Sequence, residues 1–215
     1  MSSRPRTRVT RDDWVNAARA ALVEQGVNQV RIAVLAEQLG VARSSFYWYF
    51  HDREQLLDAL LDDWAAHNTD PLVERARRPA ATITAALLAV FECWADPRVF
   101  DVPLEFAVRD WARRDERVRD RLAAADASRI EALAAMHRRF GDDRQLALVR
   151  ARVHYHSQIG LYALGVDESH AERLRLLPAY LEVLAGTVAG PDEVRAFTRL
   201  ARQLDRAGQG MSPTH

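Results

Sequence analysis

The chain has 215 residues, and its 30 basic and 30 acidic side chains give a formal net charge of zero. This length suffices to bury a hydrophobic core, and a neutral chain is unlike a protein that coats nucleic acid nonspecifically. The single cysteine, Cys93, excludes an intramolecular disulfide, and without a C-x-x-C pair we expect no metal and no cofactor. No apolar leader and no run of about 18 apolar residues occurs, so we expect a cytoplasmic protein without a membrane span.

The charge is distributed unevenly along the chain. Residues 1–53 carry eight arginines against five acidic residues, a net charge of +3, whereas residues 54–110 carry five against eleven, a net charge of −6. Four arginines come before any acidic residue: Arg4, Arg6, Arg8 and Arg11. A basic N-terminal arm of this kind suits a polyanion such as DNA, although many basic tails have no such role.

Helix signals dominate the whole sequence, while period-2 alternation and hairpin turns are nearly absent, so the chain is predicted to be all-α. The first helix is expected to begin after Thr10, with Asp13 completing a capping box, and to end at Gly26. Later helices are expected at 31–39, 43–50 and from a cap at Asp52 to Pro71, then at 81–95, 103–113, 116–140, 142–164, 169–185 and 192–207.

The second and third of these helices, joined by a tight turn at Leu39-Gly40-Val41, predict a helix-turn-helix. If residues 43–50 are α-helical, Phe46 and Phe50 face the core, and Ser44, Ser45, Tyr47 and Trp48 face outward. Hydroxyl and indole groups can contact phosphates and base edges, and Arg43 and Arg53 bracket this face with charge. The alternatives are a fully buried aromatic helix, or a helical adaptor that uses the aromatic face to bind another protein.

The N-terminal part closely resembles the DNA-binding domain of the TetR family of bacterial regulators. About 45 residues carry the resemblance, and a shorter similarity follows at Arg109 to Ala112; the matching segments are Ala17-Ala18, Glu24 to Gly26, Leu35 to Val41 and Ser45 to Leu56. The resemblance implies a homodimeric regulator, usually a repressor, that binds a double-stranded DNA operator and leaves it when a small molecule binds. It implies a DNA-binding domain at 1–53 and an effector-binding and dimerisation domain at 54–208. The short, polar tail at 209–215 is expected to be disordered.

The resemblance also assigns roles to single residues. Ser45, Tyr47 and Trp48 match positions that touch DNA in the family, Tyr49 belongs to the same segment, and Arg53 matches a lysine that contacts phosphate. The sequence departs from the family in three places. Val30 and Arg31 replace the threonine that opens the second helix, so Arg31 supplies a charge but no cap; Ala42 replaces a capping Ser or Thr; and Ser44 stands where Gly is frequent.

The C-terminal part is expected to pair two chains and to bind the effector. By resemblance, the helices at 142–164 and 169–185 form a four-helix dimer interface, with monomer core as the alternative. A dimer also suits DNA, because two half-sites lie about 34–36 Å apart. A mainly apolar effector is expected near Trp94, Phe106, Trp111 and Met136, although such residues are more often core.

The sequence argues against a metal site at two histidines and against an enzyme. His154 and His156 stand two apart on one expected helix, so they point away from each other and cannot share a metal ion. No P-loop, dinucleotide-binding glycine pattern, G-x-S-x-G or H-E-x-x-H motif is present, so no enzyme activity is expected.

Overall fold

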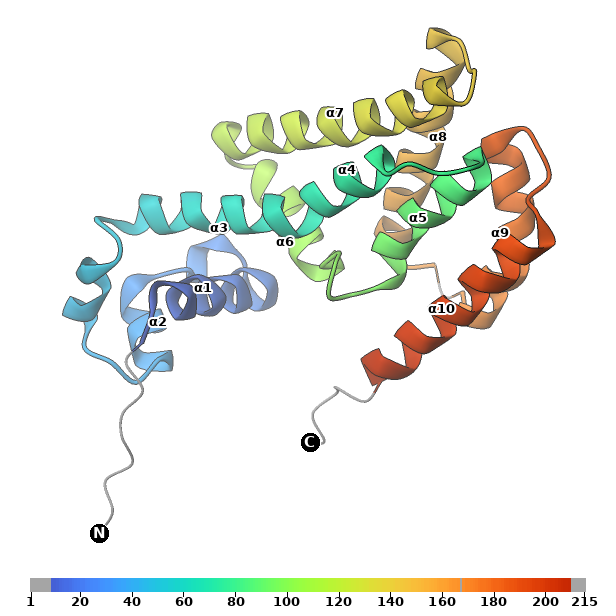
Figure 1. Cartoon of the computed structure of the whole chain (residues 1–215). Coiled ribbons are helices and arrows are strands. Elements are labelled where there is room, and N and C mark those ends of the chain that lie inside the picture. Colours follow the sequence, from blue (N-terminus) through green and yellow to red (C-terminus); the bar gives the residue numbers. More distant parts are fainter. Residues whose placement is uncertain (1–8, 167, 210–215) are drawn as a thin grey trace. The chain divides into compact units, whose positions relative to one another are not determined.

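The computed structural model describes residues 9–166 and 168–209, and over these residues it is all-helical without strands, which confirms the predicted fold class (Figure 1). In chain order the elements are α1 (Arg11–Gln25), the 3₁₀ helix η1 (Val27–Gln29), α2 (Ile32–Gln38), the 3₁₀ helix η2 (Arg43–Trp48), α3 (Arg53–Asn68), α4 (Asp70–Arg77), α5 (Ile83–Ala95), α6 (Val102–Ala112), α7 (Glu116–Arg139), α8 (Arg144–Ala163), α9 (His170–Ala185) and α10 (Pro191–Gln209).

The chain packs as two compact units, one of residues 1–66 with 103–120 and the other of residues 67–102 with 121–215. Their boundaries fall within α3 and α7 and close to the start of α6. Packing and function need not divide at the same residue, so the boundary expected between residues 53 and 54 stays a prediction. Of the expected tail, residues 210–215 lie outside the described residues, as do Arg4, Arg6 and Arg8 of the basic arm.

Local sequence signals explain where the first helix begins and ends. The Thr10 hydroxyl accepts a hydrogen bond from the Asp13 backbone N–H, and the Asp13 carboxylate accepts one from the Thr10 N–H at 2.7 Å, which confirms the capping box. Gly26 ends α1 with a φ of 82°, a conformation that side chains with a Cβ rarely adopt.

The structure contains an α-helix, α4, that the sequence pattern missed. Pro71 was expected to close the fourth segment, but it lies in the first turn of α4. Proline is tolerated there because the first N–H groups of a helix have no intrahelical acceptor. The expected single segment is therefore two helices, α3 and α4, with Thr69 between them.

The core of the first unit is aromatic. Trp14 of α1 packs edge-on against Phe46 of η2, with ring centroids 5.2 Å apart, and Phe46 stacks on Phe50 at 5.4 Å. All three rings are buried, as are Leu60 and Trp64 of α3. Fully burying such side chains contributes about 2–3 kcal/mol each, so η2 is held to the unit by its aromatic inner side.

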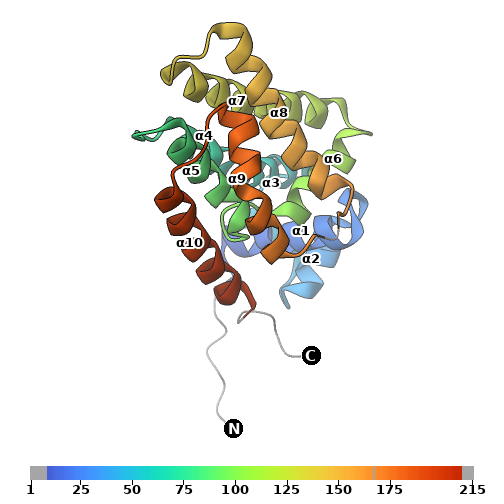
Figure 2. The same cartoon turned by 90° about the vertical axis from the view of Figure 1, so that its right-hand side faces the viewer.

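In the second unit, α5 contacts α4, α9 and α10, and α8 lies beside α9 (Figure 2). The core between these helices is aliphatic, with Leu87, Val90, Leu133 and Met136 among its buried residues. None of the helices in the described part of the chain is both long and apolar enough to span a membrane.

Candidate nucleic-acid interface and ligand cavity

The segment predicted as a recognition helix forms the 3₁₀ helix η2, not the α-helix over residues 43–50 that the sequence predicts. The Ser45 N–H bonds to the Ala42 carbonyl and the Tyr49 N–H to the Phe46 carbonyl, each at 3.0 Å, which is the three-residue spacing of a 3₁₀ helix. Ala42 offers no capping side chain, and the Ser45 hydroxyl instead donates to the Ala42 carbonyl at 2.7 Å. The Ala42 carbonyl therefore accepts hydrogen bonds from both the N–H and the hydroxyl of Ser45, which holds the first turn in 3₁₀ geometry.

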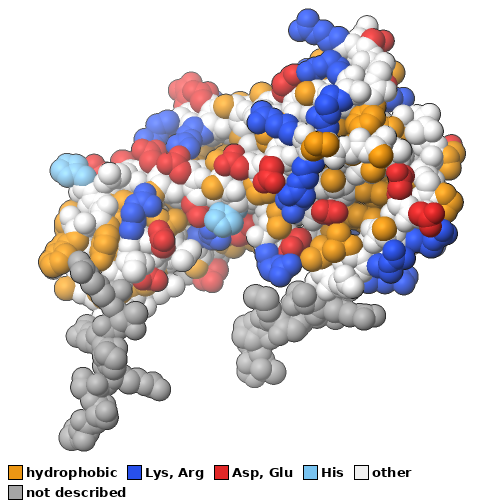
Figure 3. Space-filling model, viewed as in Figure 1, with side chains coloured by type: hydrophobic (Ala, Val, Ile, Leu, Met, Phe, Trp, Pro, Cys, Tyr) orange, Lys and Arg blue, Asp and Glu red, His pale blue; other side chains and the backbone are white. Residues whose placement is uncertain are grey.

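The predicted division between inner and outer residues is confirmed although the helix type differs. Phe46 and Phe50 are buried, whereas Tyr47 is 53% exposed and Trp48 is 75% exposed. Arg43 and Ser44 are exposed as well, and Ser45 is half-buried. Hydrophobic side chains gather at this edge of the first unit, over the turns between α2 and α3 (Figure 3). We call Arg43, Ser44, Ser45, Tyr47 and Trp48 the aromatic face.

Two other residues predicted to contact DNA, Tyr49 and Arg31, make hydrogen bonds within the protein. The Tyr49 hydroxyl donates to the Val9 carbonyl at 2.5 Å, so this ring ties η2 to the segment before α1. Arg31 is exposed at the start of α2 and donates to the Gln29 side chain at 2.6 Å; as expected, it provides no side-chain cap. The Arg31 guanidinium therefore has a hydrogen-bond partner within the protein, and its predicted contact with DNA stays a prediction.

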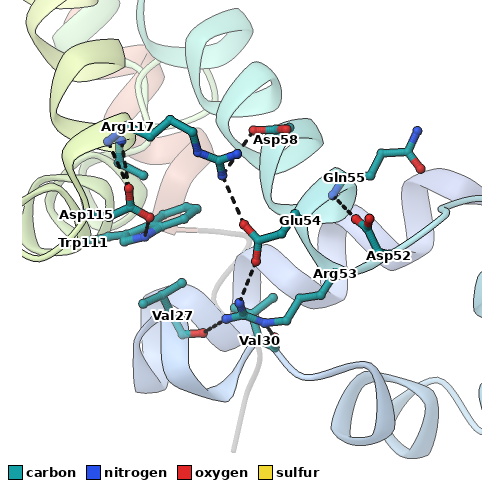
Figure 4. A network of polar contacts seen from close by, with 11 residues as sticks. Val27, Val30, Asp52, Arg53, Glu54, Gln55, Asp58, Trp111, Asp115 and Arg117 are labelled. Atoms are coloured by element: carbon teal, nitrogen blue, oxygen red, sulfur yellow. Dashed lines mark hydrogen bonds and ion pairs between the residues drawn. The ribbon is translucent and has the colours of Figure 1, made fainter.

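Arg53 lies at the centre of a polar network in the first unit (Figure 4). Its Nε donates to the Val30 carbonyl at 2.7 Å and its Nη2 to the Val27 carbonyl at 2.8 Å. Glu54 accepts from both Arg53 and Arg117, each at 3.2 Å. The guanidinium thus satisfies backbone carbonyls around η1, and the phosphate contact expected for Arg53 stays a prediction.

Replacing Arg53 by Ala is expected to lower the free energy of unfolding by about 2 kcal/mol, because both carbonyls lose a charged donor. Urea unfolding followed by circular dichroism measures the change. Arg43→Ala, at an exposed position, is the matched control and should change stability by less than about 0.5 kcal/mol. Equal stability of the Arg53 variant and the control would mean that the hydrogen bonds from Arg53 to the Val27 and Val30 carbonyls do not stabilise the fold.

The second unit contains a cavity of about 240 Å³ between α5, α8, α9 and α10. Its wall is mostly apolar and aromatic, with Phe91 and Trp94 from α5 and Phe197 from α10. His154 of α8 also lines it, and its ring lies 5.0 Å from the rings of both Phe91 and Trp94. Apolar concave sites with a few polar groups are typical of small-molecule binding.

The four residues expected around an effector do not lie together. Trp94 lines the cavity, but Met136 is fully buried in the core of the same unit. Phe106 and Trp111 belong to the first unit, where they line a different hollow beside the end of α1, and the Trp111 indole donates to Asp115 at 3.3 Å. Sequence reasoning missed His154 as a cavity residue: it rejected a metal site in favour of a solvated or hydrogen-bonded histidine, but the ring is buried and makes no hydrogen bond.

Burial lowers the pKa of His154 from 6.5 to about 3, and the nearby His137 adds to the effect. Between pH 6.5 and 3, His154 binds a proton in the unfolded chain but not in the folded chain. Its neutral, buried ring therefore costs no stability above pH 6.5, and the free energy of unfolding falls as the pH drops from 6.5 towards 3. Between pH 6.5 and 5 the free energy of unfolding is expected to fall by about 1 kcal/mol per pH unit from His154, with a slope that steepens as the unfolded chain becomes protonated.

The measurement compares wild type with His154→Leu by urea unfolding at several pH values. His137, whose burial also lowers its pKa, is present in both proteins, so the difference in slope reports His154. Identical slopes would show that His154 is protonated in the folded chain.

The two helices expected at a dimer interface expose some of their apolar side chains and bury others. Leu177, Leu181 and Leu184 of α9 are buried in the core of their own unit, so the monomer-core alternative is right for them. The exposed apolar residues are Leu146, Val149 and Val153 on α8 and Tyr180 and Val183 on α9. Val153, Tyr180 and Val183 also line the cavity, so the exposed positions on the two helices are neighbours. We call these five residues the apolar face.

In the described part of the chain, no group of three or more His, Cys, Asp or Glu side chains is placed so that it could hold a metal ion. His156 is exposed, in contrast to the buried His154 two residues before it.

Comparison with known proteins finds a family similarity for part of the first unit. Residues 15–60 match the family described as "Bacterial regulatory proteins, tetR family". The HTH-type transcriptional regulator TtgR of Pseudomonas putida is 34% identical over 88 residues, which cover 38% of this chain and 41% of TtgR. The tetracycline repressor protein class A from transposon 1721 of Escherichia coli is 37% identical over 70 residues, 33% of this chain and 32% of the repressor. The chain thus spans about two fifths or less of the length of these relatives.

Solved structures extend the similarity in fold over most of the chain. The transcriptional regulator FadR from Bacillus subtilis, in complex with stearoyl-CoA, aligns with a TM-score of 0.58 at 16% identity and covers 84% of this chain and 100% of its own. The reduced form of NemR from E. coli aligns with a TM-score of 0.55 at 18% identity, covering 85% of this chain and 99% of its own. Identities this low show the fold alone. The similarity to the tetR family of bacterial regulatory proteins therefore lies in sequence at residues 15–60, and the similarity in fold extends over most of the chain.

Proposed function

We propose that this protein is a DNA-binding transcriptional regulator, a repressor that a small, mainly apolar effector releases from its operator. The observation that carries the proposal is the aromatic face: an exposed Tyr47 and Trp48 on a short helix whose inner residue, Phe46, is fixed in the core. An exposed indole next to an exposed phenol forms an apolar patch of the kind that marks an interaction site, and it stands beside the exposed Ser44 and Arg43. Hydroxyl, phenol and guanidinium groups are the ones that contact phosphates and base edges.

The relatives support the regulatory interpretation. TtgR is named a transcriptional regulator and the transposon protein a repressor, and both match this chain over segments of 70 to 88 residues. Enzyme activity finds no support in these names, so the runner-up is a helical adaptor that binds another protein through the aromatic face.

Selection of fragments from the source genome by the full chain tests the proposal. Bound fragments are expected to share one sequence with two related half-sites, and affinity should fall by about a thousandfold or more between 50 and 200 mM salt, because phosphate contacts release counterions. No enrichment of any fragment would contradict DNA binding. A partner protein bound with little salt dependence would favour the adaptor.

The apolar face on α8 and α9 is proposed to pair with a second copy of the chain. Val149 is 51% exposed and Val183 is 73% exposed, and exposed apolar side chains that lie together favour an interface. Two copies would present two aromatic faces, which a two-half-site operator requires.

Val149→Arg is expected to raise the dimer dissociation constant at least tenfold, since it places a charge in an apolar interface. Sedimentation velocity over a concentration series measures this. Ala124→Arg, at an exposed position on α7, is the matched control and should leave the sedimentation of the wild type unchanged. A wild-type chain that sediments as a monomer at every concentration would contradict the pairing.

A further inference from the structure

The cavity between α5, α8, α9 and α10 contains buried polar atoms that make no hydrogen bond. Among the described residues, the indole Nε1 of Trp94 and both ring nitrogens of His154 have no partner. His154 is 2% exposed, so water does not reach its ring from the surface. A buried polar group without a partner costs about 1–3 kcal/mol, and most such groups in folded proteins are satisfied.

The two side chains are next to each other and both line the cavity. Their rings lie 5.0 Å apart and meet edge to face, at an interplanar angle of 84°. The wall also contains the polar side chains of Ser157, Gln158 and Tyr180 and the charged Glu168 and Arg173. Among the described lining residues, Trp94 and His154 are the ones with buried polar side-chain atoms that make no hydrogen bond.

Charge in the cavity is already balanced. Of the described lining residues, Glu168 and Arg173 are the charged ones, and Arg173 Nε lies 3.5 Å from Glu168 Oε2. The low pKa of His154 keeps its ring neutral at physiological pH. A charged ligand would consequently lose its hydration without gaining an unpaired counter-charge.

Resting on the proposed effector function, we propose that the cavity binds an uncharged aromatic or aliphatic molecule carrying a hydroxyl group, which hydrogen-bonds to Trp94 and His154. A neutral imidazole has one donor nitrogen and one acceptor nitrogen, and the indole N–H is a donor only. A hydroxyl group donates one hydrogen bond and accepts two, so one such group can accept from the Trp94 N–H and bond to one ring nitrogen of His154. A carboxylate only accepts and carries a charge, and an ammonium group only donates.

The test uses three probes of the same ring system: naphthalene, 2-naphthol and 2-naphthoate. Calorimetric titration of the full chain at pH 7 is expected to give 2-naphthol about a tenfold lower dissociation constant than either of the others, the size of effect expected when a buried donor and acceptor gain a partner. Naphthalene lacks the polar group, and 2-naphthoate is charged at this pH.

Two variants separate the polar contact from the shape of the cavity. Trp94→Phe retains an aromatic ring but removes the N–H, and His154→Leu removes both nitrogens; in each, the preference for 2-naphthol over naphthalene should fall to threefold or less. His156→Leu, at an exposed histidine of α8 that does not line the cavity, is the control and should retain the tenfold preference.

Equal affinity for the three probes, tighter binding of 2-naphthoate, binding of none of them, or an unchanged preference in both cavity variants would overturn the proposal. DNA binding by the wild-type chain is scored separately by gel shift. Failure of the gel shift would contradict the regulatory function and leave the probe affinities to decide the cavity, whereas failure of the probe series leaves DNA binding untouched.

Discussion

A chain carrying both Tyr47→Ala and Trp48→Ala is expected to lose at least about a hundredfold in affinity for its selected DNA fragment. Each contact to a base edge contributes about 1–3 kcal/mol, and a dimer loses two such contacts in each copy. Stability should change little, because the two side chains are 53% and 75% exposed, and surface substitutions outside the core cost about 0.5 kcal/mol or less. Gel shifts give the affinity, and urea unfolding gives the stability.

The control for this double variant is Leu164→Ala, which removes an exposed apolar side chain from the second unit. It should bind the same fragment as tightly as the wild type. If the double variant shifts DNA as well as this control does, Tyr47 and Trp48 do not belong to the DNA interface, and the aromatic face needs another partner.

The first unit could be predicted from sequence in some detail because its signals are local. A capping box needs only Thr10 and Asp13, three residues apart, and the Asp52 carboxylate caps α3 by accepting from the Gln55 N–H at 2.8 Å. The inner and outer sides of η2 follow from the spacing of Phe46 and Phe50. The helix type was wrong, because an uncapped six-residue segment gains little from α-helical bonds, and its geometry is set by packing of Phe46 on Trp14.

The ligand cavity could not be predicted in the same way. An aromatic residue lines a cavity or fills a core depending on which distant helices meet around it, and the sequence does not specify this for Trp94 and Met136. The leucines of α9 illustrate the same point, since Leu181 is apolar, correctly spaced and buried in its own unit, while the neighbouring Val183 is exposed. Helical periodicity identifies an apolar side but not the partner that covers it.

Replacing Arg109 by Met is expected to lower the free energy of unfolding by about 3 kcal/mol, because it removes an arginine that pairs with a buried carboxylate. Glu105 of α6 is fully buried; one carboxylate oxygen accepts from the Trp64 indole at 2.8 Å, and the other lies 2.8 Å from Arg109 Nη2. Arg113→Met, at an exposed position after the end of α6, is the control and should cost less than about 0.5 kcal/mol.

A second substitution separates loss of the ion pair from loss of packing. Glu105→Gln removes the buried charge but keeps an amide oxygen that can accept from Trp64, so the double variant Glu105→Gln, Arg109→Met should be more stable than Arg109→Met alone. Urea unfolding of the wild type, both single variants and the double variant gives the coupling free energy directly. Additive losses would mean that Arg109 stabilises the fold through the packing of its aliphatic stem. The short similarity to the family at Arg109 to Ala112 would then reflect the shape of these side chains more than their charge.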